Sequence, residues 1–146
     1  MRRTIHGPEH NQRIAQFVAE QLGHKEGFAR FQAIGIEEDG EIIAGATYDY
    51  YNGACLNMHI ASKGKHWITR EALHFAFWYP FVQLGVKRIN GFIPASRKEA
   101  IRFAEHLGFV HEHTLKHGAP DCDMLLYRML KDECRWLNMK VRYVQT

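Results

Sequence analysis

The stretch PASRKEAIRFAEHLGF, from Pro94 to Phe109, decides the fold class because it encodes a short amphipathic helix with an apolar strand pattern on either side. Its apolar residues recur at helical spacing: Ala100, Ile101, Ala104 and Leu107. Gly108 suits the left-handed conformation that ends many helices, and Phe109 is placed to fold back onto the helix as the next strand begins. The stretch therefore predicts a helix over Arg97 to Leu107, a glycine stop and a strand.

The residues before this stretch predict a helix, a three-stranded meander and a second helix. Apolar spacing predicts the first helix, over Glu9 to Leu22 with Gly23 as its stop. Thr69 is a plausible N-cap for the second, which runs to about Leu84 and is kinked or ended early by Pro80. Alternation predicts the three strands of the meander over Phe28 to Glu37, Glu41 to Tyr51 and Ala54 to Ala61, with hairpin turns at Asp39-Gly40 and Asn52-Gly53.

Three further strands are predicted, over Val86 to Ile93, Val110 to Lys116 and Met124 to Leu130. The order places helices between strands of one mixed sheet, and 146 residues suit a single domain. The pattern predicts an α/β (α+β) protein with one domain over 1–146, in which 131–146 form a C-terminal extension. The aromatic and apolar residues of that extension suit packing on the domain or on a partner.

Two motifs resemble the GCN5-related N-acetyltransferase (GNAT) superfamily. Glu105 to Phe109 matches the E-K/R-L-G-F that ends its last conserved helix. Arg70-Glu71-Ala72-Leu73, Phe81, Leu84-Gly85-Val86 and Arg88-Ile89 look like positions in the branch that acetylates the N-termini of ribosomal proteins. Small divergent phage-encoded members are also similar. The resemblance implies the acyl-CoA N-acyltransferase fold, a mixed central sheet with a splayed strand pair and helices on both faces.

The resemblance also implies an acetyl-CoA site. In the superfamily the strands corresponding to Ala54 to Ala61 and Val86 to Ile93 part, and their unpaired backbone binds the pantetheine arm like another strand. The next loop and helix N-terminus bind the pyrophosphate. The cofactor-binding residues carried over are His59, Ile60, Ala61, Lys63, Gly64, Lys65, His66, Trp67, Ile68, Thr69, Arg70 and Arg97.

The phosphate loop departs from the superfamily pattern Q/R-x-x-G-x-G/A. Trp67 stands at a glycine position and Thr69 at a small position, so close approach of backbone to phosphate is lost there. Lys63, Lys65 and His66 keep the local charge favourable. The alternative, a solvated basic turn with Trp67 as a buried anchor, remains open.

The catalytic groups depart as well. Ala104 stands where many members carry a tyrosine that protonates the leaving thiolate, and Arg97 where they carry an asparagine. A thiolate needs little help to leave, because the pKa of its thiol is about 8.5. Ser96 and Tyr127 are the alternative proton donors.

A base is also needed, because an amine must lose its proton to attack a thioester. His59 is the candidate, with Asn57 on the same face of its strand. A structural role for His59 is the alternative, and Asp49 and Tyr51 are candidates for binding a cationic acceptor.

Composition and charge limit the kinds of partner and the cellular location that the sequence suits. The net charge of +3 without a run of like charges argues against nucleic acid. Three cysteines without disulfide or metal spacing indicate a reducing cytoplasm and no metal. No stretch has the length of a membrane span or the pattern of a signal peptide. Most aromatic residues of the second predicted helix are expected in the core, and a subunit contact in a homodimer is the alternative for some of them: Phe75, Phe77, Trp78, Tyr79 and Phe81.

The sequence thus predicts an acetyl-CoA-dependent N-acetyltransferase with an unknown amine acceptor. The alternative is a degenerate module of the same fold that binds CoA or a protein without acetyl transfer.

Overall fold

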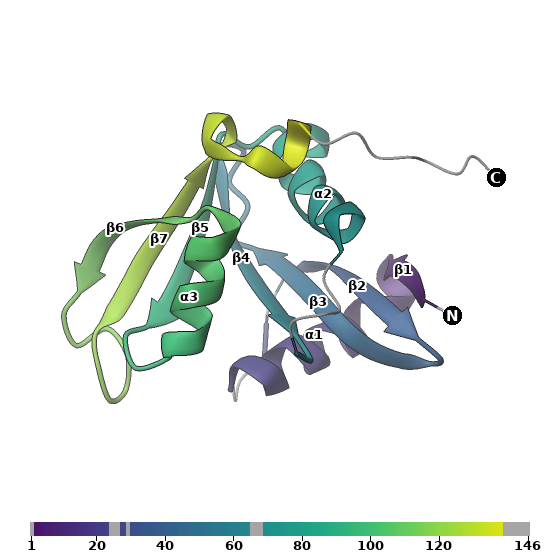
Figure 1. Cartoon of the computed structure of the whole chain (residues 1–146), viewed down its shortest axis with the longest axis horizontal. Coiled ribbons are helices and arrows are strands. Elements are labelled where there is room, and N and C mark those ends of the chain that lie inside the picture. The colour runs from purple at the N-terminus through teal and green to yellow at the C-terminus, as the bar shows by residue number, and fades with distance from the viewer. Residues whose placement is uncertain (1, 24–26, 29, 65–68, 139–146) are drawn as a thin grey trace.

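The computed structural model describes residues 2–23, 27–28, 30–64 and 69–138. The strands of these residues form one sheet in the order β1-β2-β3-β4-β5-β7-β6 (Figure 1). Every neighbouring pair is antiparallel except β4 and β5, which run parallel. The mixed sheet confirms the predicted fold class.

The strands are β1 Arg2–His6, β2 Gln32–Glu38, β3 Glu41–Asp49, β4 Cys55–Ser62, β5 Arg88–Pro94, β6 Val110–Leu115 and β7 Met124–Leu130. The α-helices are α1 Pro8–Leu22, α2 Arg70–Trp78 and α3 Lys98–Leu107, joined by the π-helical turn η1 Tyr79–Gln83 and the 3-10 turns η2 Lys131–Glu133 and η3 Arg135–Asn138.

The helix stops predicted from sequence are confirmed. Gly108 ends α3 with φ 109° and Gly23 ends α1 with φ 72°, both in the left-handed region. Phe109 is buried beside Phe77, with ring centroids 6.0 Å apart. The indole N–H of Trp136, in η3, donates to the backbone carbonyl of Leu107 at 2.8 Å. This bond satisfies one of the carbonyls that have no partner within the helix at the C-terminal end of α3.

The sequence pattern missed β1, an edge strand paired with β2 from Arg2↔Glu38 to His6↔Ile34. Glu37 of β2 holds this polar strand against the sheet and against α1. Its carboxylate accepts from Arg3 Nε at 2.7 Å and from an Arg13 guanidinium N–H on α1 at 2.8 Å. These bonds, with that from Arg3 the stronger influence, hold the pKa of Glu37 below its usual value.

Several predicted boundaries were wrong by a few residues. β2 begins at Gln32, not Phe28, and β5 at Arg88, not Val86. Asn52-Gly53 lies in a wider loop, in which Asn52 Oδ1 accepts from the backbone N–H groups of Ala54 and Cys55. As predicted, Thr69 caps α2 through a bond from Ala72 N at 3.2 Å. Regular α2 ends at Trp78, and Pro80 lies in the π-helical turn that follows.

Helices cover both faces of the sheet. α1 packs on β2 and β3 with the smaller core cluster, which includes Ile14 and Val18. α2 and α3 pack on the opposite face around the larger cluster, which includes Phe77, Leu107 and Met129. Strands on both sides of the β4–β5 pair contribute to the larger cluster. That cluster therefore joins the two halves of the sheet, β1 to β4 and β5 to β7.

Two glycines set the approach of α1. Gly35 and Gly45 face each other across β2 and β3. A Cβ at either position would lie 2.9 Å from a side-chain carbon of Ile14, and one at Gly45 would lie 3.1 Å from Val18. Ile14 therefore rests on a flat glycine pair.

We expect Gly45→Ala to lower the free energy of unfolding by about 1–3 kcal/mol, because the new methyl group overpacks the contact with Ile14. The cost should shrink in an Ile14→Ala background, which removes the clashing carbons. Chemical denaturation of the parent, both single variants and the double variant measures this coupling. Additive costs would contradict the proposed contact.

Candidate functional site

The two halves of the sheet part between β4 and β5. Their parallel ladder consists of Cys55↔Arg88, Leu56↔Ile89 and Asn57↔Asn90. β4 continues to Ser62 on the β3 side, and β5 continues to Pro94 on the β7 side. Figure 1 shows the two strands diverging beyond this ladder. The pairing thus confirms the predicted splay, with its vertex at Asn57 and Asn90.

His59 lies just beyond the vertex. It pairs across the strands with Thr47, and its Nε2 lies 3.2 Å from Asp49 Oδ1 on β3. Both side chains are largely enclosed, at 13% exposed for His59 and 6% for Asp49. The ring of Phe28 contacts the imidazole, with centroids 4.7 Å apart. Because a carboxylate only accepts, Nε2 carries the hydrogen, and neutral His59 has its lone pair on Nδ1.

Asn57 stands in a hydrogen-bonded chain at the vertex. Asn90 Nδ2 donates to Asn57 Oδ1 at 3.2 Å, and Arg88 Nε donates to Asn90 Oδ1 at 2.6 Å. Arg88 in turn pairs with Glu112 at 2.8 Å. Arg88 and Asn90 were not predicted as site residues, because their place beside Asn57 depends on the parallel register of β4 and β5.

The predicted phosphate loop is described in part. Lys63 and Gly64 are exposed, Gly64 has φ 78°, and its carbonyl accepts from Ser62 Oγ at 2.7 Å. Thr69 caps α2, whose first residue, Arg70, is exposed. The remaining predicted loop residues, Lys65, His66, Trp67 and Ile68, lie outside the described residues.

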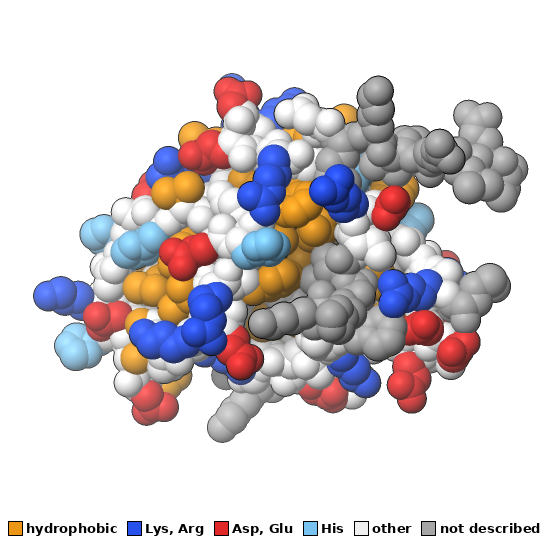
Figure 2. Space-filling model, in the orientation of Figure 1, with side chains coloured by type: hydrophobic (Ala, Val, Ile, Leu, Met, Phe, Trp, Pro, Cys, Tyr) orange, Lys and Arg blue, Asp and Glu red, His pale blue; other side chains and the backbone are white. Residues whose placement is uncertain are grey.

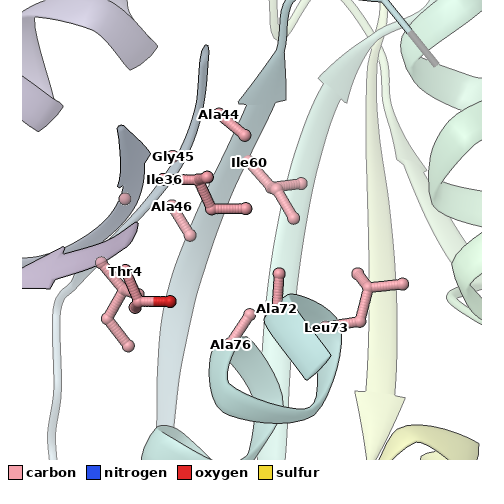
Figure 3. Close-up of a pocket in the computed structure, with 11 residues that line it drawn as sticks. Thr4, Ile36, Ala44, Gly45, Ala46, Ile60, Ala72, Leu73 and Ala76 are labelled. Atoms are coloured by element: carbon pink, nitrogen blue, oxygen red, sulfur yellow. The ribbon is translucent and has the colours of Figure 1, made fainter. Parts of the chain in front are cut away.

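A groove beside the first turns of α2 is apolar. Figure 3 shows Ala72, Leu73 and Ala76 of α2 facing the sheet, where Ile60 is one of the lining residues. The rest of its lining is Thr4, Ile34, Gly35, Ile36, Ala44, Gly45 and Ala46. In Figure 2 apolar side chains gather near the middle of this face, with cationic side chains around them. Ile60 points away from the face that carries His59, because successive strand residues alternate.

Ser96 and Arg97 lie at the other end of β5, after Pro94, away from the vertex. Ser96 Oγ is 3.5 Å from the Sγ of Cys122, and hydrogen bonding with Ser96 holds the pKa of that thiol below its usual value. Arg97 donates to the carbonyl of Leu22 at the end of α1. The structure therefore does not bring Ser96 together with His59 and Asn57.

The position of the absent tyrosine faces the core. Ala104 is 9% exposed and belongs to the larger core cluster. Tyr127 is also buried, and its pKa is raised by burial and then by the charge of Glu105. Tyr127 lies on the α3 face of β7, paired across with Gly91, whereas the Asn57 and His59 side chains occupy the opposite face.

The described part of the chain has neither a candidate membrane span nor a candidate metal cluster. No helix there is long and apolar enough to cross a membrane. Within the same residues, histidine, cysteine and acidic side chains form no group of three or more that could hold a metal ion.

Comparison with known proteins gives structural likeness without sequence likeness. No family profile and no curated protein matches the chain. A mutant of the spermidine N-acetyltransferase SpeG from Vibrio cholerae superposes with a TM-score of 0.70 at 13% identity, over 94% of this chain and 96% of that one. A GNAT-family acetyltransferase from Streptococcus pneumoniae gives 0.67 at 13% identity, over 89% and 99%. A probable acetyltransferase gives 0.63 at 15%, over 86% and 90%. The chain therefore has the GNAT acetyltransferase fold.

Proposed function

We propose that this protein transfers acetyl from acetyl-CoA to an amine. The observation that carries the proposal is the coincidence of two features at one place: β4 and β5 part after Asn57 and Asn90, and the His59–Asp49 pair lies next along β4. The parted strands suit acetyl-CoA, the acetyl donor. The His59–Asp49 pair suits an amine that must lose a proton.

The backbone of β4 beyond the vertex supports binding of the pantetheine arm. From His59 to Ser62 this strand pairs with β3 on one side and diverges from β5 on the other. Amide and carbonyl groups at such an edge bind an extended chain as a further strand would. The thioester would then reach the vertex, and the phosphates would lie toward Lys63, Arg70 and the N-terminus of α2.

His59 is the proposed base. The attacking nitrogen forms a bond to the acetyl carbon, the amine proton passes to His59 Nδ1, and the carbon–sulfur bond breaks to release the CoA thiolate. Asp49 holds the opposite nitrogen, Nε2, and favours the imidazolium that forms. The same carboxylate favours a cationic acceptor.

A non-catalytic module of the same fold is the second candidate. It is favoured by Ala104 in place of a tyrosine and by Arg97, whose side chain is engaged with α1. The argument for catalysis is that a thiolate leaves readily without a proton donor, because the pKa of its thiol is about 8.5.

Other finer assignments rest on sequence motifs and on the exposed surface. A relation to the ribosomal-protein branch or to phage-encoded members rests on the motifs quoted above. A homodimer is supported by large apolar side chains exposed on the face of β5, β7 and β6 opposite α3, namely Phe92, Val110, Leu115 and Leu130. One solved SpeG structure is a dodecamer. A cytoplasmic location and the absence of a metal remain predictions from sequence.

We expect acetyl-CoA to raise the melting temperature. A ligand that binds only the folded state stabilises it by about 2.7 kcal/mol at a hundredfold excess over its dissociation constant. Differential scanning fluorimetry with acetyl-CoA, using adenosine as the control ligand, measures the shift. An unchanged melting temperature at millimolar acetyl-CoA would refute both the transferase and the CoA-binding module.

We expect His59→Gln to reduce turnover ~100-fold or more and to leave acetyl-CoA affinity close to that of the parent, because a general base contributes on this scale. Release of free CoA thiol, measured with a panel of primary amines and polyamines, reports turnover. His106→Gln, on exposed α3 surface, is the matched control. Equal turnover in His59→Gln and the parent would assign His59 a structural role.

We expect Lys63→Glu combined with Lys65→Glu to weaken CoA binding strongly at low salt. The loss should shrink as salt rises, because charges screen over about 8 Å at physiological ionic strength. Lys116→Glu combined with Lys131→Glu, beyond the ends of β6 and β7, is the control pair. Dephospho-CoA, which lacks the 3′-phosphate, separates the two phosphate sites in calorimetry. Parent-like binding at every salt concentration would place the phosphates elsewhere.

A further inference from the structure

A row of polar side chains crosses the sheet at the vertex. Asp49, Asn57, Asn90 and Arg128 are successive cross-strand partners on β3, β4, β5 and β7. Direct partners share a face, so all four lie on one side of the sheet. His59 is on the same side, two residues along β4, at a spacing of roughly 7 Å. The row therefore lies beside the proposed base.

The hydrogen bonds in this row fix which way each amide points. Arg88 has only donors, so the Asn90 atom that it contacts at 2.6 Å must be the oxygen. Asn90 consequently turns its N–H₂ group toward Asn57, whose oxygen accepts at 3.2 Å. The N–H₂ group of Asn57 is then the branch turned away from Asn90.

Arg88 is itself held in place. Its guanidinium pairs with Glu112 at 2.8 Å, and Glu112 also lies 4.0 Å from Arg128. Hydrogen bonding from Arg88 is the largest influence that keeps the pKa of Glu112 below its usual value. A chain of fixed donors and acceptors thus runs from Glu112 through Arg88 and Asn90 to Asn57.

We propose that this chain aims the Asn57 amide N–H at the acetyl carbonyl oxygen, with Asn57 as a catalytic residue and Asn90 and Arg88 as positioning residues. The inference rests on the proposed function, because it needs the thioester at the vertex. A donor held there before the substrate arrives stabilises the charge that develops on that oxygen.

Asn57 and His59 act on different atoms in this reaction step. The amine nitrogen bonds to the acetyl carbon, and the carbonyl electron pair moves onto oxygen, where the Asn57 N–H stabilises it. The amine proton goes to His59. The electron pair returns to re-form the carbonyl, the carbon–sulfur bond breaks, and CoA leaves as the thiolate.

The deciding variant is Asn90→Asp. A carboxylate at position 90 only accepts, so it keeps the bond from Arg88 but forces Asn57 to turn its N–H₂ group toward it. The Asn57 oxygen would then face the acetyl carbonyl. Calorimetry of each protein with acetyl-CoA and with CoA, which lacks the carbonyl, separates this effect from general damage to the site.

We expect Asn90→Asp to weaken acetyl-CoA binding relative to CoA binding by about two- to tenfold, the value of one hydrogen bond. Asn57→Ala should have a similar effect, and Asn90→Asp should add nothing further in the Asn57→Ala background. Asn52→Asp is the matched control, since Asn52 Oδ1 already serves only as an acceptor there.

The outcomes separate this inference from the function on which it rests. A parent that binds neither acetyl-CoA nor CoA overturns the proposed function. Binding of both ligands with an unchanged acetyl-CoA to CoA affinity ratio in Asn90→Asp and Asn57→Ala overturns the role of Asn57 alone.

A measurement on the unmodified protein covers the case in which Asn90→Asp does not fold. The side-chain amide resonance of Asn57 should shift in proton–nitrogen spectra with acetyl-CoA and shift much less with CoA. Equal shifts would overturn the inference.

Discussion

The short parallel ladder between β4 and β5 is the constraint on which the rest of the structure depends. Parallel strands require a crossover connection, and here α2 and η1 supply it between Ser62 and Arg88. Beyond Asn57 each strand keeps its antiparallel neighbour, β3 for β4 and β7 for β5. The strands can therefore diverge without either losing its place in the sheet. Among the described residues, β4 beyond Asn57 therefore pairs with β3 but not with β5, and such a strand edge suits a ligand of extended shape.

The parted half-sheets are held together by packing on the face of α2 and α3. Tyr48 on β3 donates to the carbonyl of Ala76 at 2.6 Å, while Phe77 on the same helix packs against Phe109. Trp136 then closes the end of α3 on Leu107, and its own carbonyl contacts His74 of α2 at 3.0 Å. Because the core on this face is continuous, the opposite face at the vertex is left to polar side chains.

Sequence predicted the features whose causes are local. The stop at Gly108 and the cap at Thr69 depend on residues within one helical turn, and both are confirmed. β1 was missed because the interactions that hold it join residues far apart in the sequence. Arg3 and Arg13 bond to Glu37 from different elements. The partner of Asn57 was missed for a related reason, since register between parallel strands leaves no mark in a single sequence.

The same distinction applies to the candidate site. His59 is a candidate from sequence because it is a histidine on a predicted strand, near the place expected for the acetyl donor. Its orientation by Asp49 depends on the β3–β4 hairpin, where Asp49 pairs with Asn57 and sits diagonally from His59. Residue type thus indicated the candidate, and the register of two strands places the Asp49 carboxylate against its imidazole.

The position of Ala104 suggests why the polar groups gather on the sheet. With 9% exposure, Ala104 packs in the core that joins the half-sheets, where a tyrosine would have to displace neighbours or turn its hydroxyl outward. A donor or base carried on β4 needs no such space, because Asn57 and His59 project from the face that α3 does not cover. The proposed reaction would then proceed without an acid for the thiolate and rely on stabilisation of the charge that develops on the carbonyl oxygen.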